Sequence, residues 1–161
     1  MDSKPKIEFN KSLVSSTVEV IAKQFNTTCI AEQLEPKTAN FSNAGIDITA
    51  TLDFFGKNLH GSISLCFPKQ TFLNLMEIMF KENLSDITVD TKDGAGELAN
   101  IIFGLTKSQL NNQFQYEIKK SLPKVTFGDS VKVEGYNSHP IVILPFTTGC
   151  GLFHIELSFE E

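Results

Sequence analysis

The feature that most constrains the fold is a stretch near residue 50 in which apolar and polar residues alternate without a break. The apolar positions of this stretch are Ile46, Ile48, Ala50, Leu52 and Phe54. A period of two is typical of a β-strand that buries one face and leaves the other face polar. Turn-forming residues at 56–58 lead into a second alternating run at 62–67. Two such runs joined by a short turn predict a β-hairpin.

The rest of the chain shows helical spacing in three places and strand-like runs around them. Apolar residues recur at helical spacing over 10–25, after Pro68, and over about 85–112. An extended segment covers 29–34, and strand patterns follow at 116–122, 131–136, 141–146 and 152–159. The last strand is expected to point Phe153, Ile155, Leu157 and Phe159 inward and His154, Glu156 and Ser158 outward.

Short connections between these elements favour antiparallel pairing of the strands. The sequence therefore predicts an α+β fold in which a largely antiparallel sheet carries two long helices and one short helix on one face. The chain of 161 residues fits a single domain over 1–161.

Composition and charge exclude several classes of function. Fourteen basic and nineteen acidic residues give a net charge of −5, which argues against a sequence-independent nucleic-acid binder. No apolar run approaches the ~18 residues of a membrane span, and residues 1–10 have no stretch of signal-peptide type. Three cysteines far apart in the sequence suit a reducing compartment. We expect a cytoplasmic protein without membrane insertion.

The positions of cysteine and histidine give no sign of a metal centre. The residues concerned are Cys29, Cys66, Cys150, His60, His139 and His154. None of the intervals between them resembles the spacing of zinc ligands. We therefore expect no metal site and interpret the cysteines as buried or half-buried thiols.

The predicted helix at 85–112 carries a polar stripe as well as an apolar one. At about 100° per residue, the apolar stripe holds Leu98, Ile101, Ile102 and Leu105. The polar stripe holds Asp93, Glu97, Asn100, Gly104, Lys107 and Asn111. Spacings of three and four residues make Glu97 and Asn100 neighbours on the helix surface. The helix is thus predicted to hold a carboxylate and a carboxamide side by side, facing outward.

Glycines are unusually frequent in this helix. Gly94, Gly96 and Gly104 each cost roughly 1 kcal/mol relative to alanine in a helix interior. We interpret the bare backbone at Gly96 and Gly104 as a surface that another macromolecule approaches closely. Phe103, on the far side of the stripe from the predicted core, is a candidate exposed contact residue. A merely solvated helix face remains the alternative interpretation.

Three of these residues, together with a later proline, resemble a known signature. The pattern of Asp93, Glu97 and Asn100, followed after 22 intervening residues by Pro123, resembles that of the CheC/CheX family of chemotaxis phosphatases. The surroundings are similar too: GELANIIFG in the helix, SLPKVTFG after it, GIDITATLDFFGKNLHGSISLCF before it and VILPFTTGCGLFHIELSF at the end. The likeness covers about residues 8–159.

The number of motif copies points to one branch of this family. The N-terminal helix offers Glu19 but has Ala22 in place of a second asparagine, so only one copy is present. CheC proteins carry two such helices and CheX proteins carry one, and the chain is therefore similar to CheX. The resemblance implies a homodimer.

The resemblance also implies a reaction and a role for each residue. The substrate would be the aspartyl phosphate of a CheY-like response regulator, whose receiver domain supplies Mg²⁺, so no cofactor of the chain's own is expected. Asn100 would orient the attacking water, and Glu97 would pair with the regulator's active-site lysine.

The further candidates for partner contact are Asp93, Gly96, Phe103 and Gly104, with capping or buttressing of the helix an open alternative for Asp93. Pro123 is interpreted as structural. A binding module of the same fold without catalysis, and a purely structural dimer, are the alternative functions.

Overall fold

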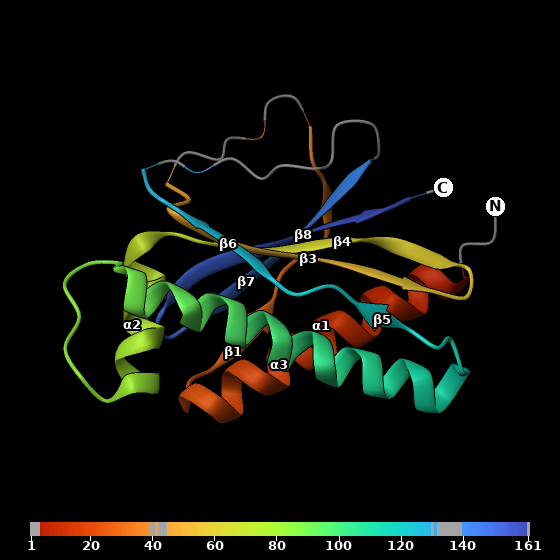
Figure 1. Cartoon of the computed structure of the whole chain (residues 1–161), viewed down its shortest axis with the longest axis horizontal. Coiled ribbons are helices and arrows are strands. Elements are labelled where there is room, and N and C mark those ends of the chain that lie inside the picture. Colours follow the sequence, from red (N-terminus) through yellow and green to blue (C-terminus); the bar gives the residue numbers. More distant parts are fainter. Residues whose placement is uncertain (1–3, 39–40, 42–44, 130, 132–139, 161) are drawn as a thin grey trace.

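The residues that the structure describes form one antiparallel sheet and three helices (Figure 1). The structure is a computed structural model, and it describes residues 4–38, 41, 45–129, 131 and 140–160. The helices are α1 (Lys4–Phe25), α2 (Lys69–Phe80) and α3 (Val89–Phe114). The strands are β1 (Cys29–Ala31), β2 (Glu35–Pro36), β3 (Ile48–Gly56), β4 (Leu59–Phe67), β5 (Lys119–Lys120), β6 (Lys124–Phe127), β7 (Ile141–Thr148) and β8 (Gly151–Phe159).

The sheet confirms the predicted antiparallel α+β architecture. Its strand order is β1-β7-β8-β4-β3-β5, with β2 also paired to β7 and β6 also paired to β3. The predicted hairpin forms between β3 and β4, in a register that sets Ala50 opposite Leu65. Because every described pair is antiparallel, the two faces of the sheet can differ in character.

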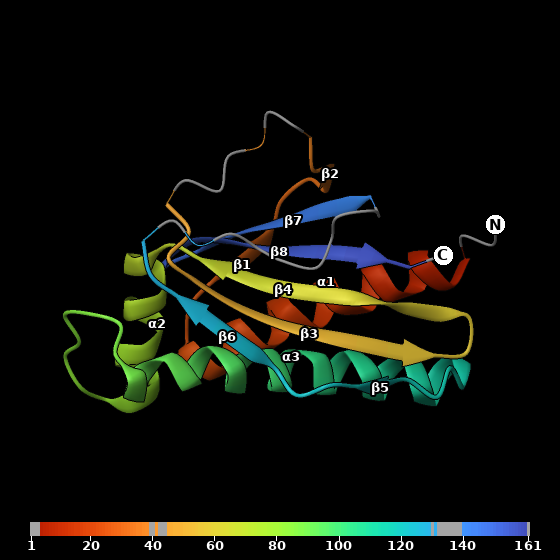
Figure 2. The same cartoon turned by 45° about the horizontal axis from the view of Figure 1, so that its top comes forward.

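The two long helices lie side by side on one face of the sheet, and α2 lies at one end of them (Figures 1 and 2). Ser12 on α1 donates a hydrogen bond to Gln109 on α3 at 2.6 Å, which joins the helices at their polar seam. None of the described helices combines the length and the apolar character that crossing a bilayer requires.

The core lies between the helices and the sheet and is rich in phenylalanine. Phe9 of α1 stacks on Phe54 of β3 with ring centroids 4.4 Å apart, and Phe103 of α3 stacks on Phe54 at 5.8 Å. At the other end of the sheet, Phe153 stacks on Phe67 at 5.0 Å. Aromatic stacking thus fixes both long helices against the sheet.

The chain after α3 differs from the prediction. The strand expected at 116–122 is reduced to the two residues of β5, because Gln115 and Glu117 adopt positive φ angles of 56° and 54° that strand geometry does not allow. Strand β6, which was not predicted, follows and pairs with β3. The strand expected at 131–136 lies outside the described residues, apart from Val131, which is in no strand.

The outward face of β8 also differs from the expectation of a solvent-facing surface. Phe153, Ile155 and Leu157 are buried against the helices, as predicted. On the opposite face, however, Glu156 and Ser158 are buried as well. Lys37 covers Glu156 with an ion pair at 2.9 Å, so this face is a second, polar interior.

Candidate functional site

Helix α3 carries the candidate site, and its first turn is tightly defined. Thr88 is the N-cap, and its side chain accepts a hydrogen bond from the backbone N–H of Thr91 at 3.2 Å. The Thr91 hydroxyl accepts in return from the backbone N–H of Thr88 at 2.8 Å. This reciprocal capping satisfies two backbone donors that a helix start leaves unpaired. The phase of every later side chain on α3 is therefore fixed.

The two sides of α3 have opposite environments. The buried residues are Thr91, Gly94, Ala95, Gly96, Leu98, Ala99, Ile102, Phe103, Thr106 and Leu110. On the other side Asp93, Glu97 and Gly104 are exposed and Asn100 is half-buried. Glu97 and Asn100, three residues apart, are neighbours on the outer side of the helix. The structure therefore places the predicted carboxylate on an accessible surface, with the half-buried carboxamide next to it.

Asn100 has an unusual environment. Its Oδ1 atom is buried, yet it has no hydrogen-bond partner among the residues that the structure describes. A buried polar atom without a partner costs about 1–3 kcal/mol, and native proteins keep few of them. Asn10 Oδ1 is buried and unpaired in the same way, so what distinguishes Asn100 is its place beside the exposed Glu97 on the polar stripe.

Two of the three glycines of α3 serve internal packing, which corrects the prediction for Gly96. A Cβ atom on Gly96 would lie 3.3 Å from Val125 Cγ2 and 3.7 Å from Pro123 Cβ. Gly96 thus lets the segment after the helix pack closely on α3, and it is not accessible to another molecule. A Cβ on Gly94 would collide with the sulfur of Met76 in α2. Only Gly104 has open space around its Cβ position among the three, as predicted for an exposed backbone patch.

The prediction for Phe103 is wrong. Its side chain is 0% exposed and contacts the rings of Phe9 and Phe54, so Phe103 cannot touch a partner. Ile101, predicted to face the core, is 38% exposed instead. The reason is that α3 packs against both α1 and the sheet, which turns its buried side toward Phe103 and away from Ile101.

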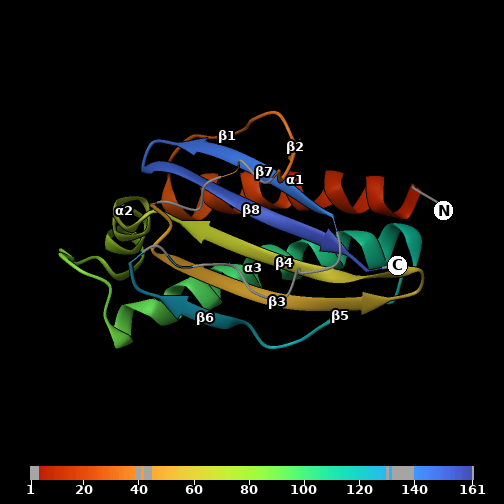
Figure 3. The same ribbon diagram turned by 90° about the horizontal axis from the view of Figure 1, so that it is seen from above.

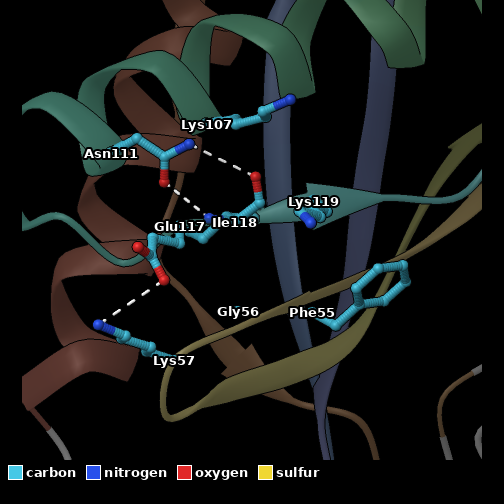
Figure 4. A pocket seen from close by; sticks show the side chains of 8 residues that line it. All are labelled: Phe55, Gly56, Lys57, Lys107, Asn111, Glu117, Ile118 and Lys119. Atoms are coloured by element: carbon cyan, nitrogen blue, oxygen red, sulfur yellow. Dashed lines mark hydrogen bonds and ion pairs between the residues drawn. The ribbon is translucent and has the colours of Figure 1, made fainter.

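A hollow of about 800 Å³ adjoins the C-terminal half of the polar stripe (Figure 4). Three lysines from three elements line it: Lys57, Lys107 and Lys119. Lys57 forms a 3.7 Å ion pair with Glu117 across the hollow. Sequence reasoning missed this basic hollow, because Lys57 and Lys119 lie far from Lys107 along the chain.

Asn111, at the inner end of the same hollow, has a structural role that the sequence did not reveal. Its Oδ1 accepts a hydrogen bond from the backbone N–H of Ile118 at 2.8 Å, and its Nδ2 donates to the carbonyl of Ile118 at 3.4 Å (Figure 4). The Asn111 side chain binds the backbone of Ile118 in the way that a neighbouring strand would. Asn111 thus anchors the returning chain, whereas Asn100 on the same stripe makes no such bond.

The chemistry available at the stripe follows from its functional groups. Asn100 offers one acceptor and two donors on a short side chain, and Glu97 offers a negatively charged acceptor. A carboxamide is not a nucleophile, but it can hold a water molecule in a fixed orientation. The pair is suited to positioning a water molecule and to pairing with a cation on another molecule.

Comparison with known proteins identifies relatives of the whole domain. The family model described as "Chemotaxis phosphatase CheX" matches residues 48–147. A CheC-like superfamily protein from Shewanella sp. PV-4 superposes with a TM-score of 0.85 at 25% identity, over 96% of this chain and 99% of that one. A chemotaxis protein CheX from Desulfovibrio desulfuricans superposes with a TM-score of 0.81 at 28% identity, over 95% and 99% of the two chains.

A third similar structure comes from a complex. It is the CheX–CheY–BeF₃–Mg²⁺ complex from Borrelia burgdorferi, with a TM-score of 0.76 at 16% identity over 95% of this chain and 98% of that one. At this identity the likeness shows a shared fold. No curated protein sequence matches the chain significantly.

Proposed function

The chain belongs to the chemotaxis phosphatase CheX family, and on that premise we propose that it hydrolyses the aspartyl phosphate of a CheY-like receiver domain. The observation that carries the proposal is the unpaired carboxamide of Asn100 beside the exposed Glu97 on the outer side of α3. Glu97 lies where a docked partner can reach it, and the buried oxygen of Asn100 becomes accessible when the carboxamide rotates.

Asn100 acts on the water. An acyl phosphate is broken when a water oxygen bonds to phosphorus as the bond from phosphorus to the aspartate oxygen breaks, which releases inorganic phosphate and the free carboxylate. The carboxamide accepts a hydrogen bond from the water and so holds it in line with the breaking bond. Rotation of the carboxamide can point either its oxygen or its nitrogen outward without breaking a hydrogen bond to any described residue. The released proton passes to the phosphate product or to solvent.

Glu97 acts on the partner. Receiver domains carry a conserved lysine beside the phosphorylation site, and an exposed carboxylate on α3 pairs with such an ammonium group in a charge-assisted bond. This contact sets the position of Asn100 relative to phosphorus. A role for Glu97 as general base is disfavoured, because a carboxylate repels the phosphoryl oxygens unless a cation lies between them. The Mg²⁺ of the receiver domain neutralises the phosphoryl oxygens themselves, and Glu97 pairs with the lysine instead.

Gly104 and the basic hollow support the same docking mode. A partner lying along α3 would pass over Gly104, where no side chain obstructs it. Beyond Gly104 it would meet Lys107 and Lys119, which favour an acidic surface. Asp93, exposed near the start of α3, either contacts the partner or stabilises the helix N-terminus through the helix dipole.

A phosphate-release assay with a phosphorylated receiver domain and Mg²⁺ tests the proposal. We expect the protein to accelerate dephosphorylation, and Asn100→Ala to reduce kcat by at least about 100-fold, as for other groups that act only in the transition state. Asn112→Ala is the matched control, because Asn112 is an exposed asparagine on the same helix but on another side. We expect it to retain full activity.

The same assay separates catalysis from a second candidate, a binding module of the same fold. Saturable binding of the receiver domain without faster phosphate release would contradict the phosphatase and favour the module. Equal activity of Asn100→Ala and the native chain would contradict the role of Asn100 even if release is accelerated.

A further inference from the structure

A group of metal-binding side chains lies on the sheet face that points away from α1 and α3. Strands β4 and β8 are neighbours (Figure 3), and their register sets Cys66 directly opposite His154. Glu156 lies two residues further along β8 and therefore on the same face. The three side chains thus come from two adjacent strands in the middle of the sheet, which holds them rigidly.

The candidate ligand atoms of this group lie close together. His154 Nε2 and Glu156 Oε2 are 3.2 Å apart, Cys66 Sγ and Glu156 Oε2 are 3.9 Å apart, and all three ligand atoms lie within 4.8 Å of one another. A tetrahedral zinc ion, with bonds of about 2.1 Å to N and O and 2.3 Å to S, sets its ligand atoms about 3.4–3.6 Å apart. Small side-chain rotations bring the three atoms to that spacing.

The surroundings of the group resemble those of a built site. Cys66 and Glu156 are fully buried, and the His154 side chain is 12% exposed. Lys37 pairs with Glu156 Oε1 at 2.9 Å and leaves Oε2 for another cation. Phe41 packs edge-on against the His154 ring, with centroids 5.4 Å apart. Lys37 and Phe41 together fix the orientation of two of the three side chains, as outer groups do around metal ligands.

We propose that Cys66, His154 and Glu156 bind one divalent metal ion of the zinc type through Sγ, Nε2 and Oε2. Thiolate, imidazole and carboxylate are the three ligand types that zinc takes from proteins. Binding releases the Cys66 thiol proton to solvent. His154 binds as the tautomer that carries its proton on Nδ1, so the hydrogen bond from Nε2 to Glu156 is replaced by two bonds to the metal.

Three protein ligands leave one position of a tetrahedral zinc ion open. A cavity of about 270 Å³, lined in part by His154, Phe41, Glu32 and Glu35, opens beside the group. Of the three proposed ligands only His154 lines it, so the cavity reaches the group from the His154 side. A zinc ion with an open position is typical of sites that bind or activate a small molecule.

The proposed site is separate from the phosphatase residues, which lie on α3 across the sheet. It also departs from the sequence-based expectation of no metal. That expectation rested on spacing along the chain, and Cys66 and His154 are brought together only by the pairing of β4 with β8. A failure of metal binding would therefore leave the proposed phosphatase activity unaffected, and the reverse also holds.

Titration of the chelator-treated, full-length protein with Co²⁺ and then Zn²⁺ tests the site. We expect one equivalent of Co²⁺ to produce a thiolate-to-cobalt charge-transfer band, and Zn²⁺ to abolish it with a Kd of about 1 μM or tighter. Zinc should also raise the midpoint of thermal unfolding, because it binds the folded chain.

Matched variants assign the ligands. Cys66→Ser should remove the charge-transfer band, and His154→Gln should weaken Zn²⁺ binding at least about 100-fold. Cys29→Ser, Cys150→Ser and His60→Gln are controls that should leave binding unchanged, and circular dichroism checks that each variant is folded. Absence of the band at saturating Co²⁺, or its persistence in Cys66→Ser, would overturn the proposal. Dependence of the band on Cys29 or Cys150 would overturn it as well.

Discussion

The two sides of α3 differ in how their polar and apolar groups are satisfied. On the inner side, Phe103 is enclosed by Phe9 and Phe54, and α3 contacts α1, α2 and the strands β3 and β6. On the outer side, Glu97 is exposed and the Asn100 oxygen has no hydrogen-bond partner among the described residues. The inner side is what a stable domain requires, whereas the outer side costs stability.

On a helix whose sequence is ambiguous, the hydrogen bonding of the polar side chains indicates a functional side better than their exposure does. Exposure alone does not separate a working surface from a solvated one, because Glu and Asn are common on both. An unpaired buried atom beside an exposed charge is more informative, since selection for stability alone tends to remove it. Substitutions on the inner side should therefore affect folding, and those on the outer side should affect turnover.

The largest effect is expected from Phe103→Ala. Removing a fully buried aromatic ring typically costs 3–5 kcal/mol in the free energy of unfolding, measurable by urea denaturation. Ile101→Ala, two residues away but partly exposed, should cost less than about 1.5 kcal/mol. Equal losses for the two variants would contradict the orientation of α3 described above. The folded fraction of Phe103→Ala should keep its phosphatase activity.

Glu97→Gln tests the charge on the outer side of α3, because glutamine has nearly the same shape as glutamate. Loss of the charge should weaken binding of the phosphorylated receiver domain by about 10-fold, or ~1.4 kcal/mol, as measured by titration calorimetry with a stable phosphate mimic. The free energy of unfolding should not change. Glu19→Gln on α1 removes a surface carboxylate that pairs with Lys23 at 2.8 Å, and it should leave partner binding intact. A loss of binding in this control would show a general charge effect instead of a specific contact.

The same substitution at an exposed and at a packed glycine of α3 tests the difference between the two sides of the helix. Gly104→Ala fills open space and should raise the free energy of unfolding by about 1 kcal/mol through helix propensity alone. Gly96→Ala should gain less or lose stability, because its new methyl group would press on Val125 at 3.3 Å. Thermal denaturation of both variants checks the order. If Gly96→Ala proved the more stable of the two, the close packing of β6 on α3 would be wrong.

The smallest effect concerns the stability of Asn100→Ala. This substitution deletes an unpaired acceptor and adds helix propensity, but it also removes the packing of a half-buried side chain, so the free energy of unfolding should stay equal or rise by up to ~1 kcal/mol. Asn112→Ala gains propensity only, and the difference between the two gives the cost of the unpaired oxygen less the packing that is lost. A clear loss of stability in Asn100→Ala would mean that the carboxamide supports the fold.

The helices and the hairpin were predictable from the sequence because their patterns are local. The period-two run before residue 55 predicts a strand, and the polar stripe from Asp93 to Gly104 follows from helical geometry alone. The segment after α3 was not predictable, since its path depends on left-handed residues at 115 and 117 and on the Asn111 side chain. The left-handed residues and the Asn111 hydrogen bonds determine the path of this segment, and strand propensity does not.

The candidate site was predictable in part for the same reason. The outward direction of Glu97 and Asn100 follows from spacing, and the structure agrees. The exposure of Phe103 and Gly96 was predicted wrongly, because a helix that packs on a sheet, a second helix and a returning strand is buried over a wide arc. The basic hollow and the group around Glu156 join segments that no pattern along the chain connects.

The packing of Pro123 on Gly96 gives the interval between the motif residues a physical meaning. From Gly96 to the end of α3 at Phe114 the helix runs about 27 Å, and the chain must cover that distance again to bring Pro123 back. The nine steps from Phe114 to Pro123 span at most about 30 Å when extended, so the return has almost no slack. A chain shortened there could not bring Pro123 back to Gly96, so the length of the helix sets the minimum interval between the two.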